Sequence, residues 1–342
     1  MSLPPSEVPQ GAIRFNTDSQ KLEFYAQGEW WVMSTDTPNL ASAGDSTPGA
    51  RGMFAGGNPS NKNEIDYINI SSTGNAIDFG NLSQGRGGGG TAGDRSRGLL
   101  MGGYVAPSYT DTIDFWTFAS TGDATDFGNL SATRGFCQAT SNSTRAINGG
   151  GWNPASDVLD YVTIQSTGNA VDFGNLSVAR EIDVASGSST RGIWAGGISP
   201  GSPASPSYNI IEFVTIATLG NTADFGDLAI ASWGGCGSGN ATRMIIFGGQ
   251  NASPATYDGT ISSITIATLG NAVKFGDMID TTAQGRGGCS SPTRAVSGGH
   301  NAPTSTEIEY VTIATEGDSV DFGDLTVARQ YASGVSNGHG GL

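Results

Sequence analysis

Short apolar segments of six residues recur six times along the chain, with glycine-rich turns between them. They read IDYINI, IDFWTF, LDYVTI, IEFVTI, ISSITI and IEYVTI. Most of their positions are apolar apart from one acidic residue, a pattern that favours β-strands covered on both faces. No helical periodicity is detectable along the chain, so the pattern predicts an all-β fold.

Each apolar segment belongs to a repeat unit of about 50 residues. The pentapeptide DFG[ND]L recurs almost unchanged at intervals of 48, 46, 52, 50 and 47 residues, after a Gly-Asn or Gly-Asp turn. Its phenylalanines are Phe79, Phe127, Phe173, Phe225, Phe275 and Phe322. An arginine opens a second apolar run, at Arg51, Arg97, Arg145, Arg191, Arg243 and Arg294. We assign the glycine pairs that close this run to Gly56-Gly57, Gly102-Gly103, Gly149-Gly150, Gly196-Gly197, Gly248-Gly249 and Gly298-Gly299.

The repeat unit predicts four strands: a segment of small residues, the run from the arginine to the glycine pair, the apolar segment, and the strand with DFG[ND]L. One such sheet cannot bury both faces, whereas radial stacking buries them, with the repeated phenylalanines between sheets. We therefore predict a β-propeller of six four-stranded blades, in which a C-terminal strand within residues 330–340 completes the first blade. In the alternative, this strand and three N-terminal strands within residues 11–33 form a seventh blade, with turns at Asn16-Thr17-Asp18 and Gln27-Gly28.

The order of these features resembles kelch repeats, whose fold is a β-propeller. The resemblance covers roughly residues 41–340. It departs from the kelch pattern in one respect, because phenylalanines such as Phe79 stand where a kelch repeat has a tryptophan.

The N-terminal segment carries a second resemblance. It runs from Gly11 through Ile13-Arg14-Phe15-Asn16-Thr17 to Glu29-Trp30-Trp31, and it resembles a short element of bacteriophage tail-fibre and virion structural proteins. The TGNAxDFG[ND]L repeats are also similar to virion-associated proteins of phages of marine cyanobacteria. The resemblance implies a virion-type hairpin segment with a linker at residues 1–40, and the repeats predict a β-propeller at residues 41–342.

Composition and charge narrow the classes of partner. The chain has a formal net charge of −15, which argues against nucleic acid and anionic membrane surfaces as partners. No apolar run reaches the length of about 18 residues that a membrane span needs, so no membrane insertion is expected. No secretory signal is visible at the N-terminus. Three cysteines are too few for a disulfide framework.

The candidate chemistry of the repeats is structural. We expect the arginines Arg51, Arg97, Arg145, Arg191, Arg243 and Arg294 to pair with the acids Asp66, Asp114, Asp160, Glu212 and Glu309 of the apolar segments, rather than to form an anion site. The fifth unit has Ser262 in place of the acid, so this pairing is not uniform. Cys137, Cys236 and Cys289 are expected as buried small residues, without a metal site. No catalytic constellation is recognisable, and neither a cofactor nor a metal is expected.

The loops between the second and third strands vary in length and carry aromatic residues, as binding loops on a rigid scaffold do. The candidate ligand-binding residues are Tyr104, Tyr109, Trp152, Tyr208, Tyr257 and His300. The sequence favours a non-enzymatic virion protein of the fibre, spike or decoration type, assembled in the host cytoplasm and located in the virion. Its expected partners are other virion proteins, further copies of itself in a symmetric attachment, and a host-surface glycan. A carbohydrate-binding or carbohydrate-active propeller and a non-viral scaffold for protein–protein interaction are the alternatives.

Overall fold

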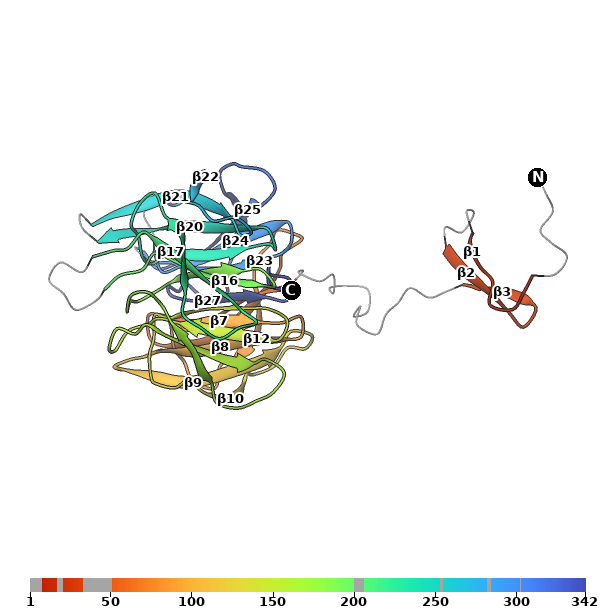
Figure 1. The fold of residues 1–342 in the computed structure, drawn as a ribbon, viewed down its shortest axis with the longest axis horizontal. Helices are drawn as coiled ribbons and strands as arrows, with labels where there is room; N and C mark the ends of the chain where they lie inside the picture. The colour runs from red at the N-terminus through yellow and green to blue at the C-terminus, as the bar shows by residue number, and fades with distance from the viewer. Residues whose placement is uncertain are drawn as a thin grey trace. The chain divides into compact units, whose positions relative to one another are not determined.

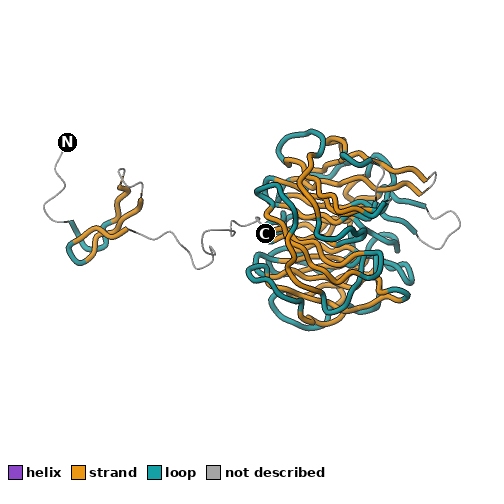
Figure 2. The backbone as a smooth tube through the Cα atoms, turned by 180° about the vertical axis from the view of Figure 1, so that it is seen from behind, coloured by secondary structure: helices purple, strands orange, loops and turns teal. Residues whose placement is uncertain are grey.

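Two compact units make up the chain, Met1–Ser46 and Thr47–Leu342. The computed structural model describes residues 8–16, 21–32, 51–199, 206–252, 255–281, 284–301 and 303–342. The predicted boundary between residues 40 and 41 lies outside these residues. Their regular structure is β throughout, as predicted, and Figure 2 shows strands and loops without a helix. The described ranges accordingly contain no helix that could cross a membrane.

The first unit contains a three-stranded antiparallel sheet with β2 in the middle (Figure 1). Its strands are β1 (Ile13–Asn16), β2 (Lys21–Ala26) and β3 (Glu29–Val32). The hairpin between β2 and β3 turns at Gln27 and Gly28, whose φ values of 56° and 86° are the positive values that such a two-residue loop requires. This turn agrees with the prediction. The other predicted turn extends through Thr17 and Asp18, which lie outside the described residues.

The second unit contains six four-stranded antiparallel sheets. The first is built from β27 (Ser333–Ser336), β4 (Arg51–Gly57), β5 (Lys62–Asn69) and β6 (Ile77–Asn81). The second and third are built from β7 (Gly90–Gly93), β8 (Arg97–Val105), β9 (Ser108–Thr117) and β10 (Thr125–Asn129), and from β11 (Gln138–Ser141), β12 (Arg145–Gly149), β13 (Val158–Thr163) and β14 (Val171–Asn175). The fourth is built from β15 (Val184–Gly187), β16 (Arg191–Ala195), β17 (Ile210–Thr215) and β18 (Ala223–Asp227). The fifth and sixth are built from β19 (Cys236–Gly239), β20 (Arg243–Ala252), β21 (Ala255–Thr265) and β22 (Val273–Asp277), and from β23 (Gly287–Ser290), β24 (Arg294–His300), β25 (Ser305–Thr312) and β26 (Val320–Asp324).

The strand order within these sheets follows the repeat. In every sheet the small-residue strand, the strand that starts at an arginine, the apolar strand and the DFG[ND]L strand lie side by side, as predicted. Together with the N-terminal sheet, the described residues form seven antiparallel sheets of three or four strands. This all-β arrangement is consistent with a β-propeller.

The small-residue strands form a closed circle of contacts. The C-terminal strand β27 pairs antiparallel with β4, where Val335 lies opposite Met53. Between sheets, β7 contacts β11, β11 contacts β15, β15 contacts β19, β19 contacts β23, β23 contacts β27, and β27 contacts β7. Figure 1 shows β27 next to β7, although the two strands are far apart in the sequence.

Hydrogen bonds between neighbouring sheets explain the most constant part of the repeat. The amide of Gly122, in a turn of the second sheet, donates to the carbonyl oxygen of Phe79 in the first sheet at 2.8 Å. A Cβ on Gly80, the glycine of the pentapeptide, would stand 2.3 Å from the carbonyl oxygen of Gly122. The equivalent hydrogen bond joins every sheet to the next. It also links the amide of Gly74 in the first sheet to the carbonyl oxygen of Phe322 in the sixth at 2.8 Å. The glycine of DFG[ND]L is therefore required by the close approach of the next sheet.

The six repeated phenylalanines are buried, which confirms the prediction made from the repeat. Each keeps only 2% or 3% of its surface exposed. They lie in hydrophobic clusters that combine residues of neighbouring sheets; Phe127, for example, packs with Leu99 of its own sheet and Val162 of the next. The ring of Phe127 also meets Phe115 edge-on, with centroids 5.9 Å apart. The core therefore lies between the sheets, where a single sheet alone would expose it.

The prediction that the first arginine of each second strand pairs with the acid of the apolar strand is wrong. Arg97, one of these arginines, lies over the ring of Phe115 at 4.8 Å and donates to the carbonyl oxygen of Ile164 in the next sheet at 3.2 Å. Its guanidinium group therefore interacts with a neutral ring and a backbone carbonyl instead of a carboxylate. The hydrogen bond to Ile164 connects neighbouring sheets.

The acids of the apolar strands pair with other arginines, which lie just before the small-residue strands. The pairs are Arg86–Asp114, Arg134–Asp160, Arg180–Glu212, Arg286–Glu309 and Arg329–Asp66, with N···O distances between 2.5 and 3.1 Å. All ten side chains are buried. In the fifth sheet both partners are replaced, by Ser232 and Ser262. The missing acid in that sheet is thus matched by a missing arginine.

The glycine pair at the end of the second strand is shifted by one residue from the prediction in two sheets. In the third sheet, positive φ values of 69° and 121° identify it as Gly150 and Gly151, not Gly149 and Gly150. In the sixth sheet the first position is Gly299, with φ of 66°, and the second is His300. A histidine therefore replaces a glycine that the other five sheets retain.

Candidate functional site

The predicted ligand-binding residues lie near the connections between second and third strands. Tyr104 is in β8, Tyr109 in β9, Trp152 after β12, Tyr208 before β17, Tyr257 in β21 and His300 at the end of β24. Four of them therefore lie in strands, because these hairpins extend further than the repeat indicates. Tyr257 is 39% exposed, whereas His300 is only 2% exposed. Ligand binding by the six residues stays a prediction.

Tyr104 and Tyr109 belong to a row of aromatic side chains. They lie opposite each other in the β8–β9 pair, with ring centroids 5.1 Å apart. The Tyr104 ring stacks on Phe136 at 6.1 Å, and Phe136 meets Tyr331 edge-on at 5.2 Å. All four residues are partly exposed. The row extends from the β8–β9 hairpin to the residues just before β27.

Phe136 and Tyr331 hold a backbone conformation that favours glycine. Their φ values are 50° and 53°, and the equivalent residues Gly88, Gly234 and Gly285 have φ of 63°, 73° and 72°. Backbone hydrogen bonds connect these positions: the Phe136 amide donates to Gly88 at 2.6 Å, Gly88 to Tyr331 at 2.9 Å, and Tyr331 to Gly285 at 2.6 Å. Such strain costs about 1–3 kcal/mol for each residue and is concentrated at functional sites in proteins.

Glu181 and Asp183 add two carboxyl groups next to this row. Glu181 is buried, and Asp183 accepts a hydrogen bond from the Gly234 amide at 2.9 Å. Burial raises the pKa of both carboxyl groups, and the charge of Asp183 raises the pKa of Glu181 further. Burial also raises the pKa of Tyr331, and the negative charges of Asp183 and Glu181 raise it further. The carboxyl groups therefore retain protons at higher pH than ordinary acids do.

We call this group of side chains the axial cluster. It consists of Tyr104, Tyr109, Phe136, Tyr331, Glu181 and Asp183. Aromatic faces can stack on a sugar ring or a peptide side chain, and protonated carboxyl groups can donate hydrogen bonds to hydroxyl or carbonyl oxygens. The arrangement is suited to binding a partly apolar, hydroxyl-bearing ligand or a protein loop.

Sequence reasoning identified only Tyr104 and Tyr109 of the axial cluster. A signal for the other members exists in the repeat. Phe136 and Tyr331 stand at a position where three other sheets have Gly88, Gly234 and Gly285. An aromatic residue in place of a recurrent glycine marks a position that differs from the structural pattern.

One cavity lies at the small-residue strands, and a second lies at the turns after three of these strands and at the C-terminal residues. One of about 50 Å³ is lined by small residues such as Thr91 and Thr140. The other, of about 230 Å³, is lined by residues that include Arg95, Asn240 and Leu342. Neither cavity has a member of the axial cluster among its described lining residues.

The three cysteines are buried thiols, as predicted. Cys137 and Cys236 begin or precede small-residue strands, and Cys289 lies within one. Burial raises the pKa of all three thiols, that of Cys236 to about 12. They therefore remain protonated near neutral pH, which makes them poor nucleophiles.

Comparison with known proteins adds no family to these observations. A scan of the chain against models of protein families gives no match, and no curated protein matches it. The resemblances to kelch repeats and to phage virion proteins stay predictions.

Proposed function

We propose that the chain is a non-enzymatic structural or appendage protein of a phage virion, and that its second unit is a six-bladed propeller. Six blades are supported by the circle of small-residue strands, by the pairing of β27 with β4, and by the hydrogen bond from the Gly74 amide to the Phe322 carbonyl oxygen. All of these contacts are made without the N-terminal strands. The proposed propeller is a rigid platform for binding other components of the particle.

The N-terminal sheet carries the proposal of attachment to a larger assembly. Ile13 and Phe15 lie on one face of β1, and 61% and 59% of their surfaces are exposed. On the other face, Arg14 pairs with Glu23 at 2.8 Å and lies over the Trp30 ring at 4.1 Å. One face is therefore packed internally, whereas the other exposes large apolar side chains. Because so small a sheet needs a covered apolar face, we infer that another virion protein covers it.

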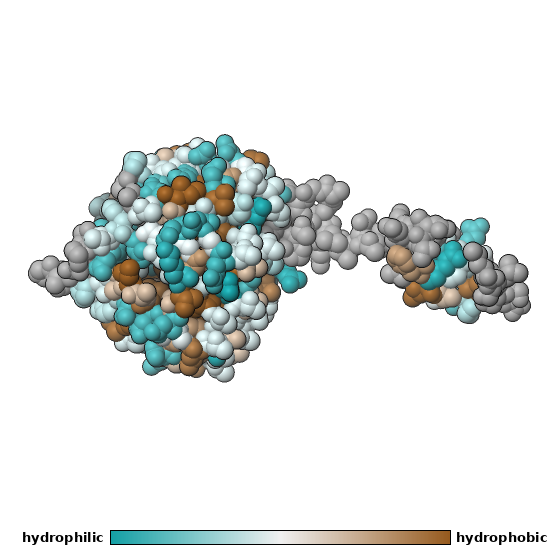
Figure 3. All heavy atoms as spheres, turned by 90° about the horizontal axis from the view of Figure 1, so that it is seen from above, coloured by the Kyte–Doolittle hydropathy of each residue, from teal (hydrophilic) through white to brown (hydrophobic). Residues whose placement is uncertain are grey.

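The axial cluster supports a second binding surface on the propeller. Its partly exposed aromatic side chains are held in place by strained backbone and by hydrogen bonds between sheets. On the face of the second unit seen in Figure 3, hydrophobic residues form small patches between hydrophilic ones. The compact aromatic group of the axial cluster favours a ligand that contacts a few rings, such as a host-surface glycan or a loop of a neighbouring subunit.

Incorporation into particles tests this function. We expect mass spectrometry of purified particles to detect the wild-type chain, and the I13S/F15S variant to be depleted at least about tenfold, because two large apolar contacts are lost. The control is I77S/V171S, which alters two similarly exposed residues of the second unit (56% and 55%) and should be incorporated normally. Absence of the wild-type chain from particles, or equal incorporation of I13S/F15S, would contradict the proposal.

A carbohydrate-binding or carbohydrate-active propeller is a second candidate, favoured by the carboxyl groups of the axial cluster. A carboxyl group that retains its proton near neutral pH can serve as a general acid in glycoside hydrolysis. Glycan-array binding and a hydrolysis assay would compare wild type with Y104A, W152A and E181Q. Binding lost in Y104A or W152A would support sugar recognition, and cleavage lost in E181Q would support an enzyme. Neither binding nor cleavage by wild type would reject this candidate.

A further inference from the structure

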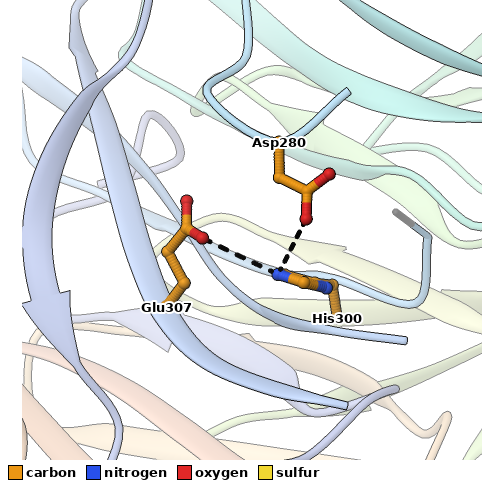
Figure 4. A group of neighbouring side chains, drawn as sticks. All are labelled: Asp280, His300 and Glu307. Atoms are coloured by element: carbon orange, nitrogen blue, oxygen red, sulfur yellow. Dashed lines mark ion pairs between the residues drawn. The ribbon is translucent and has the colours of Figure 1, made fainter. Parts of the chain in front are cut away.

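Three side chains of types that can bind a metal ion lie close together, two in the sixth sheet and one in the connection that leads into it. His300 ends β24, Glu307 lies in β25, and Asp280 lies in the connection between β22 and β23. The Nε2 atom of His300 is 3.4 Å from Oδ2 of Asp280 and 3.8 Å from Oε2 of Glu307. Figure 4 shows both carboxylates directed at this edge of the imidazole ring. The ligand atoms of the three residues all lie within 4.8 Å of one another.

The imidazole of His300 is arranged to offer Nε2 as a ligand. Its Nδ1 lies 2.9 Å from the carbonyl oxygen of Asn301, which can only accept a hydrogen bond, so the proton is on Nδ1. In the neutral ring, Nε2 then carries a lone pair. This atom is buried and has no hydrogen-bond partner among the described residues, and the side chain is only 3% exposed. Histidines that bind metals commonly donate their other N–H to a carbonyl oxygen in this way.

The sixth sheet departs from the repeat at the positions that create this group. His300 stands where the other five sheets have a glycine. The connection that holds Asp280 is also one residue longer: nine residues (278–286) lie between β22 and β23, whereas eight (130–137) lie between β10 and β11. The cluster is therefore not a by-product of the repeated fold.

We propose that Asp280, His300 and Glu307 bind a divalent transition-metal ion, for which Zn²⁺ is the best match. One imidazole nitrogen and two carboxylate oxygens are typical Zn²⁺ ligands. With tetrahedral bonds of about 2.0–2.2 Å, ligand atoms lie about 3.3–3.6 Å apart, close to the 3.4 and 3.8 Å observed here. A fourth position is left for water or an external ligand. Oε1 of Glu307, buried and without a hydrogen-bond partner among the described residues, offers a further oxygen.

This site is independent of the virion function, and its ion would tie the β22–β23 connection to the β24–β25 hairpin. The three ligands come from these two segments of the chain. The positive charge of the ion would also attract the two carboxylates that face Nε2 of His300.

Metal titration of the full chain tests the proposal. After treatment with a chelator, we expect titration calorimetry with Zn²⁺ and elemental analysis after dialysis to give about one ion per chain. The E307Q and D280N variants should weaken binding by about 100-fold or more, because each removes a ligand rather than an outer-shell partner. The control is E64Q, since Glu64 occupies the position of Glu307 in the first sheet without an equivalent histidine. It should bind Zn²⁺ like wild type.

Replacement of the ion by Co²⁺ provides a second, spectroscopic measurement. Tetrahedral coordination should give visible absorption bands in wild type and E64Q that are absent in H300G, a variant that restores the glycine of the other sheets. Circular dichroism without metal should show that the variants are folded; if E307Q is not, D280N and H300G decide. No Zn²⁺ binding by wild type, or equal binding by E307Q, D280N and wild type, would overturn the proposal.

Discussion

A buried arginine–carboxylate pair occurs in this repeat either with both partners or with neither. Arg86 and Asp114 lie 3.1 Å apart with fully buried side chains, and four other sheets contain an equivalent pair. The fifth sheet has Ser232 and Ser262 instead. Loss of one partner leaves a buried charge without compensation, which costs about 3–5 kcal/mol. Loss of both partners avoids this cost, and this explains why the two positions change together.

We predict that D114S lowers the free energy of unfolding by about 3–5 kcal/mol and that R86S/D114S is more stable than D114S. The double variant reproduces the serines of the fifth sheet and removes the unpaired guanidinium. Chemical denaturation of wild type, R86S, D114S and R86S/D114S would complete a double-mutant cycle. Additive losses in the cycle would show that the two side chains are not coupled.

From the raised pKa values of the two carboxyl groups in the axial cluster, we predict that the stability of the fold declines as pH rises. Burial raises the pKa of Glu181 and Asp183 above their ordinary values of 4.5 and 3.8. Above these ordinary values the folded protein binds more protons than the unfolded chain, so the free energy of unfolding falls as pH rises, by at most about 1.4 kcal/mol per pH unit for each group. E181Q should flatten the curve between about pH 5 and 8, as measured by denaturation at several pH values. An unchanged slope in E181Q would contradict the assigned direction.

At the scale of elements, two glycines at a contact between neighbouring sheets have opposite surroundings. Gly128, in the DFG[ND]L strand β10, approaches the turn glycine Gly168 of the next sheet so closely that a Cβ would lie 2.4 Å from its carbonyl oxygen. A Cβ on Gly168 itself would have no atom within 4 Å. Both residues have positive φ, 148° and 153°. Substitutions at these two glycines therefore distinguish the cost of backbone conformation from the cost of the close approach between sheets.

We predict that G168A and G128A both destabilise the fold, and that G128A does so more strongly. Both variants carry backbone strain of about 1–3 kcal/mol. Only G128A also forces the two sheets apart, and we expect this to lower the free energy of unfolding by a further amount of about 1–3 kcal/mol. The free energies of unfolding of the two variants would be compared under the same conditions. Equal losses would mean that close approach between the sheets does not limit this position.

The strands could be predicted from the sequence because local signals determine them. Turn glycines and apolar runs lie next to each other in the chain, and β6, with its buried Phe79, illustrates how well they indicate strands. Side-chain contacts within one sheet were harder to predict. The partner of Asp114 is Arg86, which lies before β7 and is buried against it, rather than Arg97, which is nearer in the sequence. In the third sheet, three successive glycines gave no means of choosing the pair with positive φ.

The candidate site depended even more on closure of the whole molecule. Tyr104 and Tyr331 are far apart in the sequence and are brought into one aromatic row by Phe136, from a third segment. No spacing within one repeat indicates such a row. Replacement of a recurrent glycine by an aromatic residue was the available signal, and it becomes informative once the small-residue strands are known to form a circle.

At the scale of the whole molecule, the blade number follows from which segment completes the ring. In the six-bladed arrangement, β27 is the inner strand of the first sheet, and the N-terminal sheet is not needed for closure. In a seven-bladed ring, the N-terminal strands would supply a blade. The two arrangements therefore assign opposite importance to residues 1–46, whereas both require the C-terminal strand.

We predict that deletion of residues 1–46 leaves the melting temperature of the second unit unchanged within about 2 °C. Deletion of residues 330–342 should abolish the cooperative transition, because it removes β27, opens the circle of inner strands and exposes Met53 and its neighbours in the first sheet. Calorimetry of the full chain and both deletions would measure the transitions. A large loss of stability on deletion of residues 1–46 would mean that the N-terminal strands belong to the ring, and six blades would then be the wrong number.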